Sequence, residues 1–156
     1  MSGLLMEQLH FVKGLDPVAD AFASTVASDV VDMSGWFKCL FVVYAGVGAT
    51  GSSTFTVEAC DDETPSNTTA IAYQSRMILA DDTEGAITAR TTSGFIPTVG
   101  SSKILLFEVD ANDLAASGYR YVRLKAVESV DSPVLGGILV ILGEAKDRKS
   151  IAATTI

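Results

Sequence analysis

The chain has 156 residues, enough for one domain with its own core, and 48% of them are apolar. No apolar run reaches the roughly 18 residues that cross a membrane, and the N-terminus lacks the pattern of a signal peptide, so we expect synthesis and folding in the cytoplasm. The net charge is −8, with eight basic against eighteen acidic residues over 1–145, which argues against nucleic acid as a partner.

The first residues, MSGLLMEQLHFV, are apolar and show only a weak strand pattern at residues 9–12. We assign residues 1–25 to an N-terminal arm that contains this weak edge strand. His10 is the only histidine, and one histidine cannot supply the several histidine ligands of a cupin-type metal site. Because no nucleophile motif accompanies it, we interpret His10 as a partly exposed arm residue and expect no catalytic, metal or cofactor site.

Short strand-like segments follow, separated by turns rich in Gly, Pro, Asp and Ser. They occupy residues 26–33, 36–47, 53–60, 70–79, 103–109, 119–127 and 134–142. Without a long amphipathic helix, this pattern predicts an all-β domain over 26–145, an antiparallel β-sandwich of jelly-roll-like type with extended N- and C-terminal arms. The segment DANDLAASG predicts one helical turn that ends at Gly118.

The run GVGATG at residues 46–51 matches the dinucleotide-binding pattern G-x-G-x-x-G. In a nucleotide site these glycines open a helix whose N–H groups bind the pyrophosphate. Here the next residues alternate polar and apolar, with Phe55, Val57 and Ala59 on one side. We therefore predict a strand after the glycines, which we interpret as the positive-φ loop of a β-hairpin.

The two cysteines lie on the two predicted arms of this hairpin. If Phe37, Cys39, Phe41 and Val43 face the core, alternation on the partner strand turns Cys60 outward. Side chains on opposite faces cannot form a disulfide, and a cytoplasmic protein rarely keeps one. We expect two free thiols.

The predicted strands at residues 103–109 and 134–142 are apolar on both faces. An antiparallel sandwich normally presents polar side chains to solvent. Either loops of the same chain cover these strands or a neighbouring subunit does, and the high apolar fraction favours the neighbour. We therefore expect self-association as a dimer or trimer.

Two polar features could bind a ligand. The acidic clusters at residues 61–63 and 81–84 lack the spacing of a calcium-binding loop, so we interpret them as solvated turns, with Ca²⁺ the first ion to consider. In YRYVRLKAV, Tyr121, Arg123 and Lys125 share one face, as in a docking surface or an ordinary outer strand. We favour the ordinary strand, and a protein over nucleic acid if this face binds a partner.

The run FVVYAGVGATGSSTFTVEACDDETPSNTTAIAYQSR resembles a group of small structural proteins of tailed phages and prophages. FEVDANDLAASGYRYVRLKAVESVDSPVLGGILVILGEA resembles the second half of the same group, and LDPVADAFASTVASDVVDM extends the resemblance more weakly. The resemblance implies a non-enzymatic head decoration (cement) protein, a β-sandwich on the outer capsid of the virion that is assembled in the host bacterial cytoplasm.

The partner implied by this resemblance is the major capsid protein. The expected contacts are apolar side chains of the N-terminal arm and, at the other end, basic side chains of a C-terminal tail at residues 146–156. They are Leu4, Leu5, Met6, Leu9, Phe11, Lys146, Arg148 and Lys149.

Two other functions stay open. A tail- or fibre-associated carbohydrate-binding module would need exposed aromatic side chains near a loop rim, and Trp36 is the only tryptophan. An enzyme with a barrel fold would have to rely on His10, beside which the sequence shows no nucleophile motif.

Overall fold

The computed structural model describes residues 3–47, 50–97 and 101–147. Across these residues the chain forms eleven strands and two short helices. The strands are β1 (His10–Val18), β2 (Thr25–Ala27), β3 (Val31–Asp32), β4 (Trp36–Ala45), β5 (Ser52–Cys60), β6 (Thr68–Ile71), β7 (Tyr73–Ile78), β8 (Thr88–Arg90), β9 (Lys103–Asp110), β10 (Tyr121–Val130) and β11 (Gly136–Ala145). The helices are α1 (Leu5–Gln8) and α2 (Ala111–Ala115), and neither described helix has the length and apolar character needed to cross a membrane.

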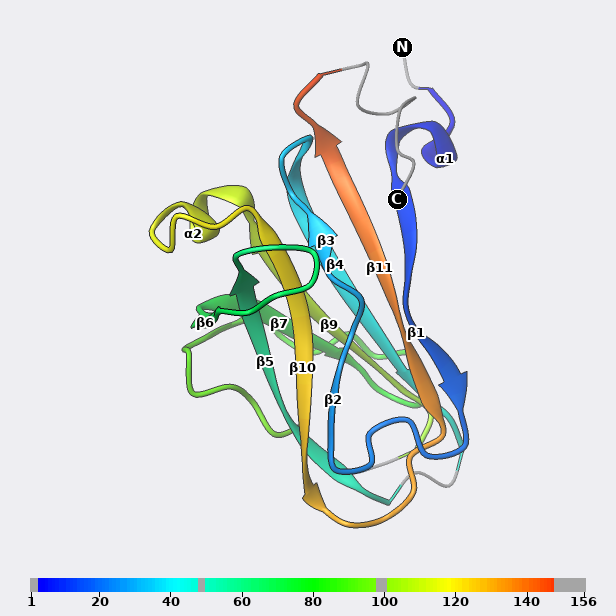
Figure 1. The fold of residues 1–156 in the computed structure, drawn as a ribbon. Coiled ribbons are helices and arrows are strands. Elements are labelled where there is room, and N and C mark those ends of the chain that lie inside the picture. The colour runs from blue at the N-terminus through cyan, green and yellow to red at the C-terminus, as the bar shows by residue number, and fades with distance from the viewer. Residues whose placement is uncertain (1–2, 48–49, 98–100, 148–156) are drawn as a thin grey trace.

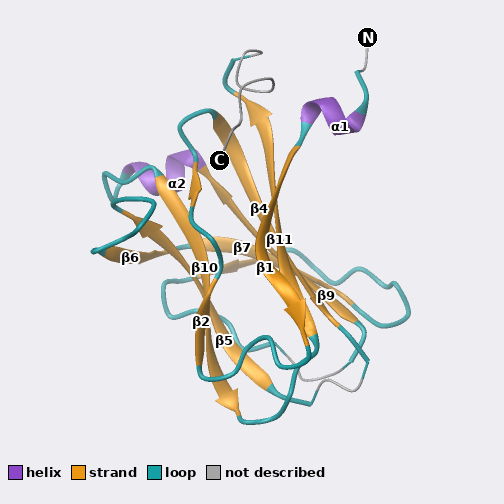
Figure 2. Ribbon diagram, turned by 45° about the vertical axis from the view of Figure 1, so that its right-hand side comes forward, coloured by secondary structure: helices purple, strands orange, loops and turns teal. Residues whose placement is uncertain are grey.

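The strands form two antiparallel sheets that pack face to face (Figure 1, Figure 2). Sheet A has the order β1-β11-β4-β9-β7-β8 and sheet B the order β2-β10-β5-β6, with β3 also paired to β10. When β3 and the β7–β8 hairpin are set aside, eight strands remain. Each of these lies in the opposite sheet from the strand before it in the chain, except β6, which follows β5 in sheet B. This is the strand order of a jelly roll, so the predicted all-β sandwich is confirmed in its jelly-roll form.

The core between the sheets consists of the inward half of each alternating strand. On β4, Cys39, Phe41 and Val43 are fully buried. Phe55 of sheet B stacks on Phe107 of sheet A with ring centroids 5.1 Å apart, so aromatic contacts join the two layers directly.

The glycine-rich segment at residues 46–51 does not close a hairpin, so that prediction is wrong. β4 belongs to sheet A and β5 to sheet B, and the segment carries the chain from one sheet to the other. Gly46 and Gly51 do not have positive φ, so backbone conformation does not explain them. They are glycines because neighbouring residues leave no room for a side chain. A Cβ on Gly46 would lie 2.9 Å from Leu135 Cδ2, and one on Gly51 would overlap the carbonyl oxygen of Ser132. A strand follows directly, as the alternation predicted.

The predicted boundary between N-terminal arm and sandwich is wrong, because His10–Val18 forms β1, which pairs with β11 in sheet A and so belongs to the sandwich. The predicted strands after it appear with local differences. The segment 26–33 divides into β2 and β3, and 70–79 divides into β6 and β7, which lie in different sheets. The short β8 has too few residues to show a pattern and was not predicted. α2 forms where predicted: the Asp110 carboxylate accepts a 2.8 Å hydrogen bond from the Asn112 N–H, and Gly118 follows with φ +75°.

Candidate interaction surfaces

On the side of sheet A that points away from the core, the central strands present mainly apolar side chains, bordered in the same rows by Lys13, Glu108 and Arg76. Strand register brings these side chains into three rows across neighbouring strands: Phe11–Ile141–Leu40, Lys13–Leu139–Val42–Leu106 and Gly137–Tyr44–Ile104. We call these residues the apolar face. Tyr44, Phe11 and Leu139 are 61%, 48% and 40% exposed, so loops of the described chain do not cover them. Of the two coverings that the sequence left open, the described loops are therefore excluded at these residues.

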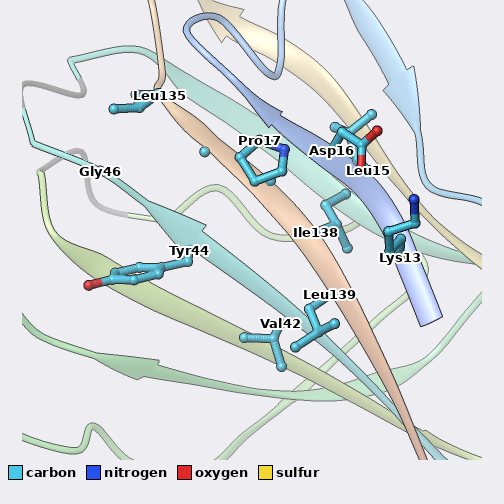
Figure 3. A pocket seen from close by; sticks show the side chains of 12 residues that line it. Lys13, Leu15, Asp16, Pro17, Val42, Tyr44, Gly46, Leu135, Ile138 and Leu139 are labelled. Atoms are coloured by element: carbon cyan, nitrogen blue, oxygen red, sulfur yellow. The ribbon is translucent and has the colours of Figure 1, made fainter. Parts of the chain in front are cut away.

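A hollow of about 510 Å³ opens at one end of the apolar face (Figure 3). Its walls include Pro17, Val42, Tyr44 and Leu135, and Gly137 lies among its lining residues. A Cβ on Gly137 would lie 2.8 Å from the Leu15 carbonyl oxygen and 3.0 Å from the Pro17 nitrogen, so this position requires glycine for β1 to approach. We call this the first hollow.

A second hollow, of about 570 Å³, lies at the other end of the same face. Leu9, Leu40, Ile141 and Gly143 are among its lining residues, together with the charged side chains of Lys38, Glu108 and Glu144. The first hollow thus reaches the middle row of the apolar face, whose Lys13, Val42 and Leu139 are among its lining residues, and the second begins at the next row.

Charged side chains beside the second hollow are paired with one another. Lys38 Nζ lies 2.9 Å from an Asp110 carboxylate oxygen and 3.7 Å from Glu108. The hydrogen bond to Asp110 raises the pKa of Lys38, and the Asn112 N–H followed by Lys38 lowers the pKa of Asp110. Since Lys38 is bonded in place, it borders the apolar face as part of an ion pair.

The N-terminal segment forms a second apolar surface. Leu4, Leu5 and Met6 are 63 to 76% exposed, at and beside α1, which lies beyond the end of the sandwich near β11 (Figure 1). A Glu7 carboxylate oxygen accepts a 3.0 Å hydrogen bond from the Leu4 N–H, which holds the turn together. We call residues 3–8 the α1 arm. The other two predicted arm residues, Leu9 and Phe11, lie at the second hollow and on the apolar face, respectively.

The predicted basic contacts of the C-terminal tail are described in part. Lys146 Nζ donates a 3.3 Å hydrogen bond to the Met33 carbonyl and lies 5.3 Å from the Phe37 ring centroid, so Lys146 is tied to the body of the sandwich. Phe37 was expected to face inward and is exposed, while its neighbour Trp36 is buried. Arg148 and Lys149 lie outside the described residues.

His10 belongs to β1 and is half-buried, which agrees with a partly exposed histidine. Its ring stacks on Trp36 with centroids 6.0 Å apart, and burial lowers the pKa of His10. Because Trp36 is buried beneath this contact, the only tryptophan is unavailable for stacking on a sugar.

The outer side of sheet B has at its centre a buried carboxylate that is paired with two basic side chains. Glu58 is buried between the predicted basic side chains, with carboxylate oxygens 2.8 Å from Arg123 and 3.2 Å from Lys125. The sequence placed Glu58 on the outer side of its strand, but only the pairing of β5 with β10 brings it to these cations. This is an ordinary outer strand face, as favoured from the sequence.

Both thiols are free and buried, as predicted for their redox state. Alternation with the core residue Ala59 places Cys60 on the outer side of sheet B, yet it is fully buried there. Burial raises the pKa of Cys60 to about 11 and raises the pKa of Cys39 further.

The acidic clusters are turn formers, as interpreted. Asp61 accepts hydrogen bonds from the N–H groups of Ser66 and Asn67, and Asp81 accepts one from Thr83. The hydrogen bond from the Asn67 side-chain amide, followed by these backbone bonds, lowers the pKa of Asp61, and the bond from the Thr83 N–H lowers that of Asp81. The described residues contain no group of three or more side chains suited to hold a metal ion.

Comparison with known proteins gives similarities of fold at low identity. No protein-family model and no curated protein matches the chain. The SPBc2 prophage-derived protein YomS is 12% identical over 87% of this chain and 93% of its own, with a TM-score of 0.48. The CBM22-1–GH10 modules of Clostridium thermocellum xylanase 10B are 9% identical over 91% of this chain and 27% of theirs, with a TM-score of 0.33. None of these similarities bears on function.

Proposed function

We propose that the protein is a non-enzymatic structural protein of a phage virion, a head decoration protein that binds the major capsid protein and stabilises the shell. The resemblance of residues 41–76 and 107–145 to small structural proteins of tailed phages supports this proposal. The observation that carries it is the α1 arm at one end of the sandwich, where Leu4, Leu5 and Met6 are exposed apolar side chains.

The α1 arm is suited to a groove on a neighbouring capsid subunit. Each Å² of apolar surface removed from water contributes about 25 cal/mol, so one arm gives only a modest affinity after the cost of association. A decoration protein that contacts two neighbouring capsid subunits gains from multivalency, so weak single contacts suffice. The rigid sandwich then holds those subunits at a fixed separation.

The test is co-sedimentation with capsids assembled without this protein, followed by cryo-electron microscopy. The wild type is expected to add density at fixed lattice positions. A triple variant, Leu4→Ser, Leu5→Ser and Met6→Ser, is expected to bind at least about tenfold more weakly. The matched control replaces three exposed apolar residues elsewhere, Ile87, Ile96 and Val130, with serine and is expected to bind like the wild type.

Two results would contradict the proposal in different ways. The absence of ordered density at saturating protein would contradict capsid binding itself. Equal occupancy by the arm variant would contradict the role of the α1 arm. Binding on a glycan array, with density on the tail or fibre instead, would favour the carbohydrate-binding alternative.

A further inference from the structure

The edges of both sheets are protected against the addition of a strand. β1, the one long edge strand in the described chain, has register shifts on both sides of Leu15 and contains Pro17, which has no N–H. The Gly14 carbonyl in this strand already accepts a 2.8 Å hydrogen bond from the Asp29 N–H. The other edges, β8, β2 and β6, have three or four residues each. A partner is therefore expected to meet the face of sheet A and not an edge.

The apolar face is of a size that suits a weak, reversible interface. Its most exposed side chains are those of Tyr44, Phe11 and Leu139. The largest apolar patch on a typical monomer is about 300–600 Å² and is often functional, whereas a standard interface buries about 800 Å² per partner. An interface through the apolar face and its rim therefore lies at the small, weak end of the range.

The hollows and exposed rings of the apolar face are placed so that the face of one copy can fit the face of a second copy. Along β11, Gly137 and Ile141 lie two residues on either side of Leu139, each about 7 Å away. The end at Gly137 has the first hollow and the exposed ring of Tyr44. The end at Ile141 has the second hollow and the exposed ring of Phe11. Each end of the face thus offers one hollow and one ring.

We propose that two copies of this chain pair through the apolar face, related by a two-fold axis that crosses the strands at Leu139. Such a rotation exchanges the two ends of the face, as an isologous interface requires. It places Phe11 of each copy at the first hollow of the other, and Tyr44 at the second hollow. Leu139 then packs against Leu139 of the second copy.

Lys13 is the charged side chain next to this axis. It pairs with Leu139 in the middle row, so the rotation places Lys13 of one copy opposite Lys13 of the other, at the β1 edge of the interface. Both side chains are exposed on an edge strand, where they extend away from each other into water. The repulsion between two copies of net charge −8 is largely screened at about 0.15 M salt, where the Debye length is about 8 Å.

Sedimentation equilibrium of the isolated protein in about 0.15 M salt tests this proposal without capsids. The expected result is a reversible monomer–dimer equilibrium. Leu139→Glu places two like charges together on the axis and is expected to weaken the dimer about a hundredfold. The matched control is Val127→Glu on the outer side of sheet B, because Val127 is 39% exposed against 40% for Leu139. The control is expected to dimerise like the wild type.

A second variant tests the position of the axis without disturbing the face. Facing sheets lie about 10 Å apart, beyond the reach of a disulfide, so Leu139→Cys is treated with a short bismaleimide. Cys39 and Cys60 are buried and do not compete. Leu139→Cys is expected to give a covalent dimer, and Val127→Cys is not.

Several outcomes would overturn the two-fold proposal. They are a monomer at all concentrations, a trimer, a dimer that survives Leu139→Glu, and cross-linking at Val127 in place of Leu139. Because these measurements contain no capsid protein, their failure leaves the proposed capsid binding by the α1 arm unaffected, and the reverse also holds.

Discussion

The outer faces of the two sheets carry different kinds of side chain, although both lie opposite the core. On sheet B the centre of the face holds Glu58, buried and bonded to Arg123 and Lys125. On sheet A the corresponding centre holds Leu139, Val42 and Leu106, with charged pairs only at the rim. The outer side chains at the centre of sheet B therefore find their interaction partners within the chain. Those at the centre of sheet A remain exposed and can contact a partner molecule.

This difference separates the stability of the single chain from its capacity to associate. Residues on the outer face of sheet B interact with one another, so replacing them is expected to affect folding. Residues on the apolar face have little to contact within the chain, so replacing them is expected to affect association. The predictions below test this separation, from the largest effect to the smallest.

The largest effect is expected at Glu58. Glu58→Ala leaves Arg123 and Lys125 side by side without their carboxylate, which is expected to lower the free energy of unfolding by about 3 kcal/mol. Leu139→Ser on the apolar face is expected to change it by less than about 1 kcal/mol. Urea denaturation measures both, at a protein concentration low enough to avoid a contribution from association. Equal losses in the two variants would mean that the apolar face stabilises the single chain after all.

A kinetic effect is expected at Cys60 on the closed face of sheet B. With a pKa of about 11, its thiolate fraction at pH 8 is about a thousandth, against about a quarter for an ordinary cysteine. The native protein is expected to react with a thiol reagent at least about a hundredfold more slowly than the protein in urea. Rapid reaction of one thiol in the native state would show that the outer face of sheet B opens to the reagent. Glu58→Ala is expected to increase this opening and therefore the rate at which Cys60 reacts.

The smallest effect is a pH dependence at the edge of sheet A. Burial lowers the pKa of His10, so the unfolded chain binds its proton more tightly than the folded one. The contribution of His10 to the free energy of unfolding is therefore fully present above the unfolded pKa of 6.5. It is lost as the pH falls from 6.5 through the pKa of the folded state. His10→Phe keeps a ring on Trp36 and is expected to flatten the decline between pH 6.5 and 5 in urea denaturation. An unchanged slope in this variant would assign the decline to other groups.

Other groups with lowered pKa values titrate outside that window. Asp61, Asp81 and Asp110 have pKa values below 3.8, so any stability linked to them is lost only at lower pH. A comparison at pH 7 and pH 5 therefore isolates His10 from these carboxyls.

Much of the local structure could be predicted because it depends on neighbouring residues. The alternation through Phe55, Val57 and Ala59 correctly gave the inward side of β5, and DANDLAASG correctly gave α2. The alternation failed at Phe37 because the period of two breaks there: Trp36 and Cys39 are both buried although they are three residues apart, and on the paired strand Glu144 has φ +55°. The apolar strands also signalled an uncovered face, although they could not say which residues meet on it.

The wrong hairpin shows the limit of this reasoning. Two strands joined by a glycine-rich loop have the same local pattern whether they pair with each other or cross to opposite sheets. β4 and β5 cross because each finds its partners elsewhere, β4 with β11 and β9, and β5 with β10 and β6. Those partners are distant in sequence, so no local signal could reveal them.

The sequence by itself determined most of the strand positions, most of the side chains that avoid water, and the presence of strands that are apolar on both faces. Only the tertiary structure decided which side chains share a face, since that depends on strand register. The pairing of His10 with Leu142 joins the first strand, β1, to the last strand, β11. This long-range pairing, together with that of β4, assembles the apolar face and its two hollows, because side-chain alternation is local to a strand and a surface belongs to the whole sheet.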